Sequence, residues 1–252
     1  MRPDVIDLRQ FYTSPLGQLA RRHLTRLVRE IWPETHGFTV VGLGFATPYL
    51  RPFREEAARV VALMPAAQGV LHWPADEPSL VGLTDETELP LPDNSVDRLL
   101  LVHALENSEE MRPLLREAWR VLASGGRLLV VVPNRVGLWA RFEDNPFGHG
   151  SPFSPQQLSR LLRDNLFSPR QFRRGLFMPP FRVRTMLRLS GWLERAGARW
   201  WPRLAGVHLV EAEKQIYAVT PIPVRQKRRR LVPAGLLPAP ERRITASEPP
   251  FR

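Results

Sequence analysis

Five short apolar runs in the first 133 residues constrain the fold of this chain most strongly. Each run is continuously hydrophobic, whereas a strand with one solvated face would alternate apolar and polar residues. Strands of this kind are buried on both faces, as in a parallel sheet covered by helices. The runs are FTVVGLG at 38–44, RVVALMP at 59–65, SLVGLT at 79–84, VDRLLLVHAL at 96–105 and GRLLVVVP at 126–133.

Amphipathic segments alternate with these runs. Apolar residues at spacings of three and four predict a helix that begins near Ser14-Pro15 and reaches Trp32. PYLRPFREEA after the first run and EEMRPLLREAWRVLA before the fifth are also helical, and Ser124-Gly125-Gly126 is the predicted stop of the second. The later elements are a helix opened by Ser154-Pro155, a strand near 170–176, a helix near 182–197 and a final strand over 206–220. This order predicts a doubly wound α/β sheet with ligands at the carboxyl ends of its strands.

Composition excludes several kinds of site. The 252 residues include no cysteine, so a disulfide framework and a Cys-ligated metal centre are both ruled out. The six histidines lack the spacings of metal ligands, and we expect no metal site. The N-terminal segment lacks the apolar run of a signal peptide, and no apolar run is long enough to span a bilayer. We therefore expect a cytoplasmic protein without a transmembrane segment.

The net charge of +11 is concentrated at the C-terminal end. Residues 221–252 hold 8 Lys/Arg and 2 Asp/Glu, which leaves a net charge of +5 for residues 1–220. Because this tail is rich in Pro and has no periodicity, we predict a folded domain over 1–220 and a disordered tail over 221–252. Its basic run at 225–230 could bind nucleic acid or an anionic membrane, but without interleaved aromatic residues a solvated tail is the favoured interpretation.

The first apolar run leads into the glycine loop GLGFAT at 42–47. Gly42 and Gly44 can adopt positive φ and let a ligand approach the backbone, while Thr47 and Pro48 are suited to the start of a helix. A cofactor at a helix N-terminus fits this pattern, and a plain tight turn is the alternative. Dinucleotide sites carry an acid at the end of the second strand, but here Met64 stands there, which argues against NAD.

Residues 85–134 carry the most specific motif of the chain. The stretch reads DETELPLPDNSVDRLLLVHALEN and, later, LLREAWRVLASGGRLLVVVPN. It resembles the class I S-adenosylmethionine (SAM)-dependent methyltransferases of the type 11 group, and the likeness extends back to Val40. The resemblance implies a Rossmann-like seven-stranded sheet whose last strand is antiparallel, with helices on both faces and SAM as the cofactor.

The resemblance also implies a set of cofactor contacts. Gly42, Gly44 and Phe45 would lie against the methionine part of SAM, and Asp85 and Glu86 would lie near its adenine. Tyr12 is expected either to close over the cofactor or, equally, to pack against the first helix as a hydrophobic staple. The cofactor-binding residues predicted in this way are Tyr12, Gly42, Gly44, Phe45, Met64, Asp85, Glu86 and His103.

Methyl transfer from a sulfonium is an in-line displacement, so the protein mainly supplies proximity, orientation and sometimes a base. His103, just after the fourth strand, is the best candidate base, and a histidine that only bonds the backbone is the equal alternative. His149 is the second catalytic candidate. Glu106 could bind a cationic acceptor, but capping of the following helix is the favoured role.

The long loop at 134–153 is dense in aromatic, charged and Gly residues, which is typical of functional loops. We predict that it covers the acceptor, and the alternative is that its aromatic residues anchor the loop to the core. The predicted acceptor contacts are Asn134, Trp139, Arg141, Phe147 and His149. Trp200 and Trp201 are interpreted as packing residues at a helix end.

Two functions follow from these patterns. The first is a SAM-dependent methyltransferase that acts on a small or amphipathic acceptor. The second is a catalytically inactive methyltransferase-like protein that binds or regulates a partner. Met64 in place of the ribose-binding acid supports the second function, whereas the glycines, the acidic pair at 85–86 and the long loop support the first.

Overall fold

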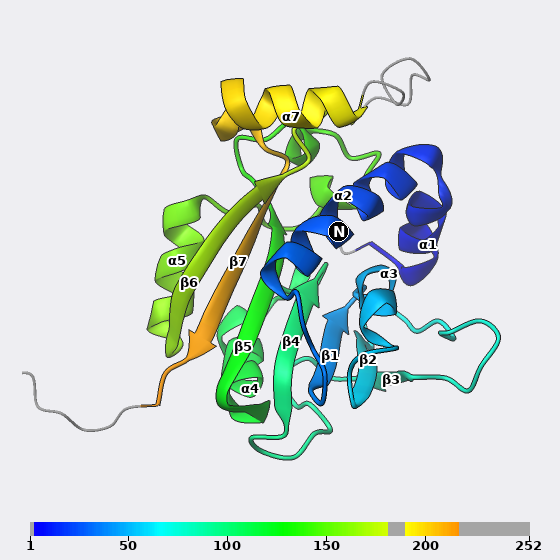
Figure 1. Ribbon diagram of the computed structural model, residues 1–252, viewed down its shortest axis with the longest axis vertical. Coiled ribbons are helices and arrows are strands. Elements are labelled where there is room, and N and C mark those ends of the chain that lie inside the picture. The colour runs from blue at the N-terminus through cyan, green and yellow to red at the C-terminus, as the bar shows by residue number, and fades with distance from the viewer. Residues whose placement is uncertain (1–2, 181–189, 217–252) are drawn as a thin grey trace, which may run out of the picture. The chain divides into compact units, whose positions relative to one another are not determined.

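The computed structural model describes residues 3–180 and 190–216. Within them, one sheet has the strand order β3-β2-β1-β4-β5-β7-β6 (Figure 1). Neighbouring strands are parallel except at β7, which runs antiparallel to both β5 and β6. The bounds are β1 (Thr39–Gly44), β2 (Arg59–Pro65), β3 (Val81–Thr84), β4 (Val96–Val102), β5 (Leu122–Pro133), β6 (Phe167–Gly175) and β7 (Val207–Lys214). The predicted seven-stranded sheet with an antiparallel last strand is confirmed.

Helices cover both faces of this sheet (Figure 1). Those on the described residues are α1 (Val5–Thr13), α2 (Pro15–Ile31), α3 (Thr47–Leu50), α4 (Met111–Val121), α5 (Pro155–Asp164) and α7 (Ser190–Trp200). Short 3₁₀ turns are η1 (Arg51–Phe53), η2 (Leu105–Asn107), η3 (Trp139–Arg141), η4 (Pro146–Gly148) and η5 (Pro202–Leu204). No helix in the described ranges is long and apolar enough to cross a membrane.

The core consists of two apolar layers, one on each face of the sheet. Val40 and Leu100 belong to the layer under α1 and α2, whereas Val41 and Leu99 belong to the layer under α4 and α5. Neighbouring residues of one strand therefore face different helices, and both sets are buried. This arrangement explains why the strands read as continuous apolar runs.

Ser14 separates the first two helices. It is the N-cap of α2, where its Oγ accepts a hydrogen bond from Gly17 N at 3.1 Å, and its own N–H bonds Gln10 O in the last turn of α1. The predicted helix start is confirmed, and α1 is an additional helix. Ser154 opens α5 in the same way, with a capping box completed by Gln157.

Two predicted helix boundaries were wrong. Helix α3 begins at Thr47, with Ala46 as its N-cap, but it ends after one turn rather than at Ala57 because Pro52 lacks the N–H that would continue the helix. Helix α4 ends at Val121 rather than at Ser124-Gly125-Gly126. It ends early because Leu122 already pairs with Val96 of β4 and belongs to β5.

The chain divides into two units, residues 1–216 and 217–252. The predicted tail at 221–252 and the end of the predicted last strand, 217–220, lie outside the described residues. The proposed boundary at residue 220 therefore stays a prediction.

Candidate functional site

Aromatic side chains from separate segments meet at the carboxyl ends of β1 and β4. Tyr12 of α1 stacks on Phe45, with ring centroids 5.5 Å apart and planes 17° apart. The ring of His103, which follows β4, lies 4.7 Å from the ring of Phe147. All four side chains are buried, so the structure brings these predicted residues together but packs them on one another.

A chain of hydrogen bonds runs through this cluster. Tyr49 Oη donates to Tyr12 Oη at 2.8 Å, and Tyr12 Oη lies 2.8 Å from His103 Nε2. His103 Nδ1 lies 3.1 Å from Glu106 Oε1. If Tyr12 donates in turn to Nε2, the imidazole is neutral and its Nδ1–H donates to the carboxylate. Burial and the adjacent Tyr49 raise the pKa of Tyr12 well above its usual value, so the phenol stays protonated.

The backbone of His103 is in the left-handed region, with φ of +52°. Its carbonyl accepts hydrogen bonds from Gln68 Nε2 and from Asn107 Nδ2, both at 3.2 Å. A strained residue held by its surroundings at the end of a sheet is a feature of functional sites. Because both ring nitrogens are engaged, His103 is held in place here by two side chains rather than free to accept a proton.

Glu106 does not cap a helix, so the favoured prediction for it was wrong. It lies in η2, which has no side-chain cap, and its Oε1 bonds His103 instead. Its other oxygen, Oε2, is buried and has no hydrogen-bond partner among the described residues. A buried carboxylate oxygen without a partner is costly, and it marks a place where a ligand can donate.

The two loop glycines serve the packing of the chain itself. Gly44 has φ of +86°, and a Cβ there would lie 2.3 Å from Val102 O. A Cβ on Gly42 would lie 2.5 Å from Ala46 Cβ. The glycines allow the tight passage from β1 to α3, as the alternative interpretation of this loop expects.

A cleft of about 620 Å³ opens at the carboxyl ends of β2, β3 and β4. Its lining residues are Pro65, Ala66, Ala67, Thr84, Asp85, Glu86, Thr87, Glu106, Asn107, Ser108, Glu109, Glu110, Gly150 and Ser151. The carboxylate of Asp85 accepts hydrogen bonds from Thr87 N at 2.8 Å and Thr87 Oγ1 at 2.7 Å, which lower the pKa of Asp85. Asp85 and Glu86 thus lie together on one cleft, whereas Met64 is 1% exposed in the core.

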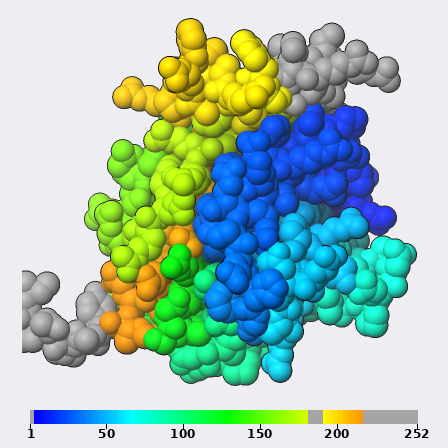
Figure 2. Space-filling model, viewed as in Figure 1, coloured from blue at the N-terminus to red at the C-terminus, as the bar shows by residue number. Residues whose placement is uncertain are grey.

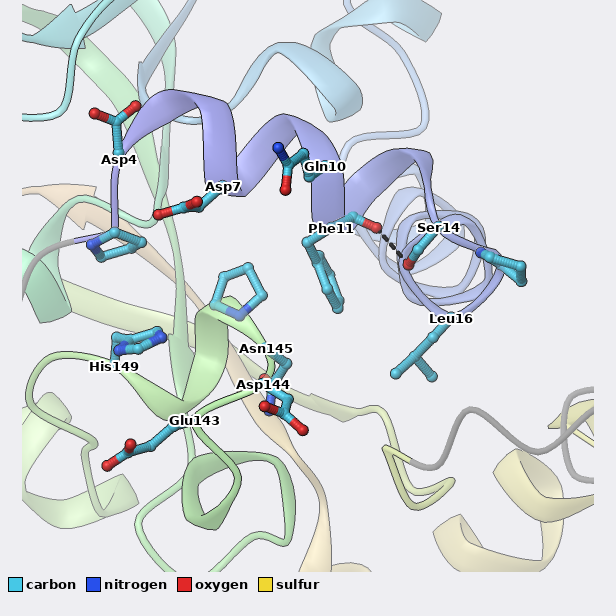
Figure 3. A pocket seen from close by; sticks show the side chains of 13 residues that line it. Asp4, Asp7, Gln10, Phe11, Ser14, Leu16, Glu143, Asp144, Asn145 and His149 are labelled. Atoms are coloured by element: carbon cyan, nitrogen blue, oxygen red, sulfur yellow. Dashed lines mark hydrogen bonds between the residues drawn. The ribbon is translucent and has the colours of Figure 1, made fainter.

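A second pocket, of about 680 Å³, lies between α1 and the long loop at 134–153 (Figure 3). His149 lines it from the loop, and Asp4 and Asp7 line it from α1. The ring of Phe11 also lines this pocket and contacts Tyr12 edge-on at 5.1 Å. His149 and His103, the two predicted catalytic residues, therefore lie in different sites.

The loop is fastened to the rest of the protein by its own side chains. Asn134 Nδ2 donates to Ala205 O at 2.7 Å, and Trp139 Nε1 donates to Met178 O at 2.7 Å. Trp139 and Phe147 are fully buried, which favours the anchoring interpretation for both aromatic residues. Arg141 is exposed.

The sequence interpretation missed Tyr49. Neither Tyr49 nor Gln68 stands in a motif, and only the fold brings Tyr49 to Tyr12 and Gln68 to His103. In the part of the chain that the structure describes, no group of three or more His, Cys, Asp or Glu residues is arranged to hold a metal ion.

A sheet in which only β7, the last strand along the chain, runs antiparallel, with a cleft at the carboxyl ends of its parallel strands, is the fold of class I methyltransferases. A SAM-dependent methyltransferase from Thermotoga maritima, titled a possible histamine N-methyltransferase, matches with a TM-score of 0.56 and 18% identity over 84% of this chain and 96% of that one. The cyclase SpnF matches at 0.54 with 22% identity over 80% and 83%. At these identities the likeness concerns the fold alone, and SpnF illustrates that one fold serves different reactions.

Residues 40–130 match the family model described as a methyltransferase domain. A protein of Mycobacterium tuberculosis named a probable S-adenosylmethionine-dependent methyltransferase is 36% identical over 128 residues, which are 47% of this chain and 46% of that protein. A relative of the same description from Mycolicibacterium smegmatis is 33% identical over 104 residues, 41% and 39% of the two chains. The chain thus spans less than half the length of these relatives. Residues 40–130 thus resemble the methyltransferase domains of the class I, type 11 group, as the sequence predicted.

Proposed function

We propose that this protein is a SAM-dependent methyltransferase that binds SAM in the cleft at the carboxyl ends of β2, β3 and β4. The family match over residues 40–130 and the names of its relatives support this function. The observation that carries the location is Glu106 Oε2, a buried oxygen without a hydrogen-bond partner on a residue that lines the cleft. A hydroxyl or amino group of the ligand would donate a hydrogen bond to it, and the positive charge of the sulfonium would be attracted to the carboxylate.

The cleft suits the nucleoside part of SAM. Its volume of about 620 Å³ is in the usual range for small-ligand sites, and its acidic side chains accept hydrogen bonds from ribose and adenine donors. In this proposal Glu106, in the η2 turn after β4, supplies the carboxylate that Met64 does not supply at the end of β2. Asp85 and Glu86 contact the adenine side.

SAM when bound supplies an electrophilic methyl group on a sulfonium, and the chain orients the partners. Glu106 holds His103 at Nδ1 and Tyr12 occupies its Nε2, so the imidazole can take a proton from an acceptor only after Tyr12 moves. Tyr12 and Phe45 fill the end where the resemblance predicts the methionine part. Binding of the whole cofactor therefore requires Tyr12 to give way.

For the acceptor we propose a small molecule in the pocket of about 680 Å³ between α1 and the loop. Asp4, Asp7, Glu143 and Asp144 line this pocket, and they favour an acceptor that carries an amine or another cationic group. His149 is the nearest candidate to exchange a proton with such a group. The cytoplasmic location stays a prediction.

A second candidate function is a catalytically inactive, methyltransferase-like binding protein. The packing of Tyr12 on Phe45 and the engagement of both His103 nitrogens favour it, because these contacts fill the predicted methionine end. Binding of the cofactor separates the two candidates.

The test is a calorimetric titration of the full chain with SAM and with its demethylated product. Ala67 is exposed and lines the cleft, so Ala67→Phe fills it with little effect on folding. Ala58, exposed just before β2, provides Ala58→Phe as the matched control.

We expect micromolar affinity, about 8 kcal/mol, for the wild type and Ala58→Phe. Ala67→Phe should lose this binding. No heat with either ligand in the wild type would overturn the proposal and leave the inactive candidate. Unchanged binding in Ala67→Phe would show that the cofactor binds outside this cleft.

A further inference from the structure

Three tryptophans are exposed on α7 and just after it. Trp192, Trp200 and Trp201 are 60%, 75% and 46% exposed. The expectation that Trp200 and Trp201 pack at a helix end was therefore wrong. The other four tryptophans of the chain, Trp32, Trp73, Trp119 and Trp139, are buried or half-buried. Large apolar side chains gathered on one exposed segment mark an interaction surface.

The opposite face of α7 is the one that packs on the protein. Glu194 is buried, and its Oε1 accepts a hydrogen bond from Met178 N at 3.2 Å. A Cβ on Gly197 would lie 2.3 Å from Phe177 Cβ, so the helix lies directly on this segment. These contacts fix which face of α7 remains outside, and they turn its single carboxylate inward.

The outer face combines aromatic and basic side chains. Trp192, Arg195 and Arg199 recur at spacings of three and four, so they share one side of the helix, and all three are exposed. Arg203 and Leu204 in η5 extend the exposed surface beyond the helix. An amphipathic helix with Trp and Leu beside Arg has the composition of helices that lie in a membrane interface.

The charge of α7 and η5 indicates what kind of partner surface they contact. Residues 190–204 contain three arginines, and their only acidic residue is the buried Glu194. Arginine stems pack along apolar surface while the guanidinium groups reach phosphates, and tryptophan rings prefer the level of the lipid headgroups. We propose that α7 and η5 dock on a lipid bilayer with anionic headgroups, with the helix axis in the plane of the surface.

The shape of this segment favours a bilayer over nucleic acid. Figure 2 shows α7, in yellow, as a ridge that stands out from the neighbouring elements. A ridge can lie on a flat surface, whereas proteins that bind single strands follow them along a basic groove.

The docking surface adjoins the loop at the carboxyl end of β5. Asn134, the first loop residue, donates through Nδ2 to Arg203 O at 3.0 Å. Val207, which follows η5, pairs with Pro133 at the end of β5. The surface therefore lies beside the loop that lines the acceptor pocket. The docking itself does not depend on the methyl-transfer proposal.

The test is co-sedimentation of the full chain with vesicles of phosphatidylcholine alone and of equal parts phosphatidylcholine and phosphatidylglycerol. The first variant replaces Trp192, Trp200 and Trp201 by Ser, and the second is Arg195→Glu with Arg199→Glu. The controls are Leu83→Ser, which changes an exposed apolar side chain on β3, and Arg160→Glu, which reverses the charge of an exposed arginine on α5. Thermal unfolding checks that every variant remains folded.

We expect the wild type and both controls to bind the anionic vesicles, more weakly as salt rises, and to bind neutral vesicles poorly. The arginine variant should bind at least 25-fold more weakly, because each basic residue at such a surface contributes roughly fivefold. The tryptophan variant should also lose binding. Equal binding by wild type and both variants would assign the interaction to another segment and overturn the proposal. So would binding of polyuridylate without binding of vesicles.

Discussion

Glu106→Gln tests the proposed cofactor site most directly, because it removes a charge and keeps the shape of the side chain. The carboxylate accepts from His103 Nδ1 at 3.1 Å through one oxygen, and its other oxygen is buried without a partner. The glutamine oxygen can keep the bond to His103. Removal of an unpaired buried charge offsets the weakening of that bond, so the free energy of unfolding should change by less than about 1 kcal/mol. The melting temperature should then shift by no more than about 4 °C.

Ligand binding should respond far more strongly. A hydrogen bond to a charged group contributes about 1.5–3 kcal/mol, so the dissociation constant should rise about 10- to 100-fold. Equal losses for SAM and for its demethylated product would assign the contact to the nucleoside, whereas a larger loss for SAM would assign it to the sulfonium. The matched control is Glu109→Gln, which makes the same change at an exposed residue of the same cleft and should leave the affinity within about twofold. Unchanged affinity in Glu106→Gln, together with lower stability, would contradict a ligand contact at Glu106 and leave this residue as a support for His103 alone.

Two further predictions concern stability. Gly44→Ala should lower the free energy of unfolding in urea by about 2–5 kcal/mol, since the new Cβ would lie 2.3 Å from Val102 O at positive φ. Gly125→Ala, also at positive φ but in open space, should lower it by only about 1–2 kcal/mol. Equal losses of stability in the two variants would contradict a clash at Gly44. Burial, aided by the charge of Arg174, lowers the pKa of His208 to about 4, so the folded state resists protonation there. Stability should be complete above about pH 6.5 and should fall by about 3 kcal/mol as the pH drops toward 4, and His208→Leu should abolish that part of the decline in urea titrations at each pH.

Local patterns predicted the framework of the fold because the physical causes were themselves local. Burial on both faces makes a strand apolar throughout, as at Val40 and Val41, and Ser14 and Ser154 carry capping signals beside a proline. The same kind of signal was present for α1, where Val5, Leu8 and Tyr12 recur at helical spacing after Asp4, the N-cap residue. This helix could have been found from the sequence.

The arrangement of the site depends on contacts that local patterns do not contain. Tyr12 and His103 are 91 positions apart, and only the pairing of β1 with β4 and the packing of α1 bring them within 2.8 Å. Glu106 suited a helix cap by its position, but η2 placed it under the imidazole instead. The exposure of Trp200 depended on which face of α7 the protein covers, and Glu194 and Gly197 decide that through contacts with another segment.

Strand β6, which forms one edge of the sheet, has consequences for how copies of the protein meet. It pairs with β7 on one side only, so its other edge has no strand partner in the described sheet. Pro169 has no N–H to offer along the strand, and Arg170, Arg173 and Arg174 would bring like charges together if two such edges aligned. Pairing of one β6 edge with another is thereby disfavoured. Even at high concentration, this protein should resist forming fibres through the β6 edge.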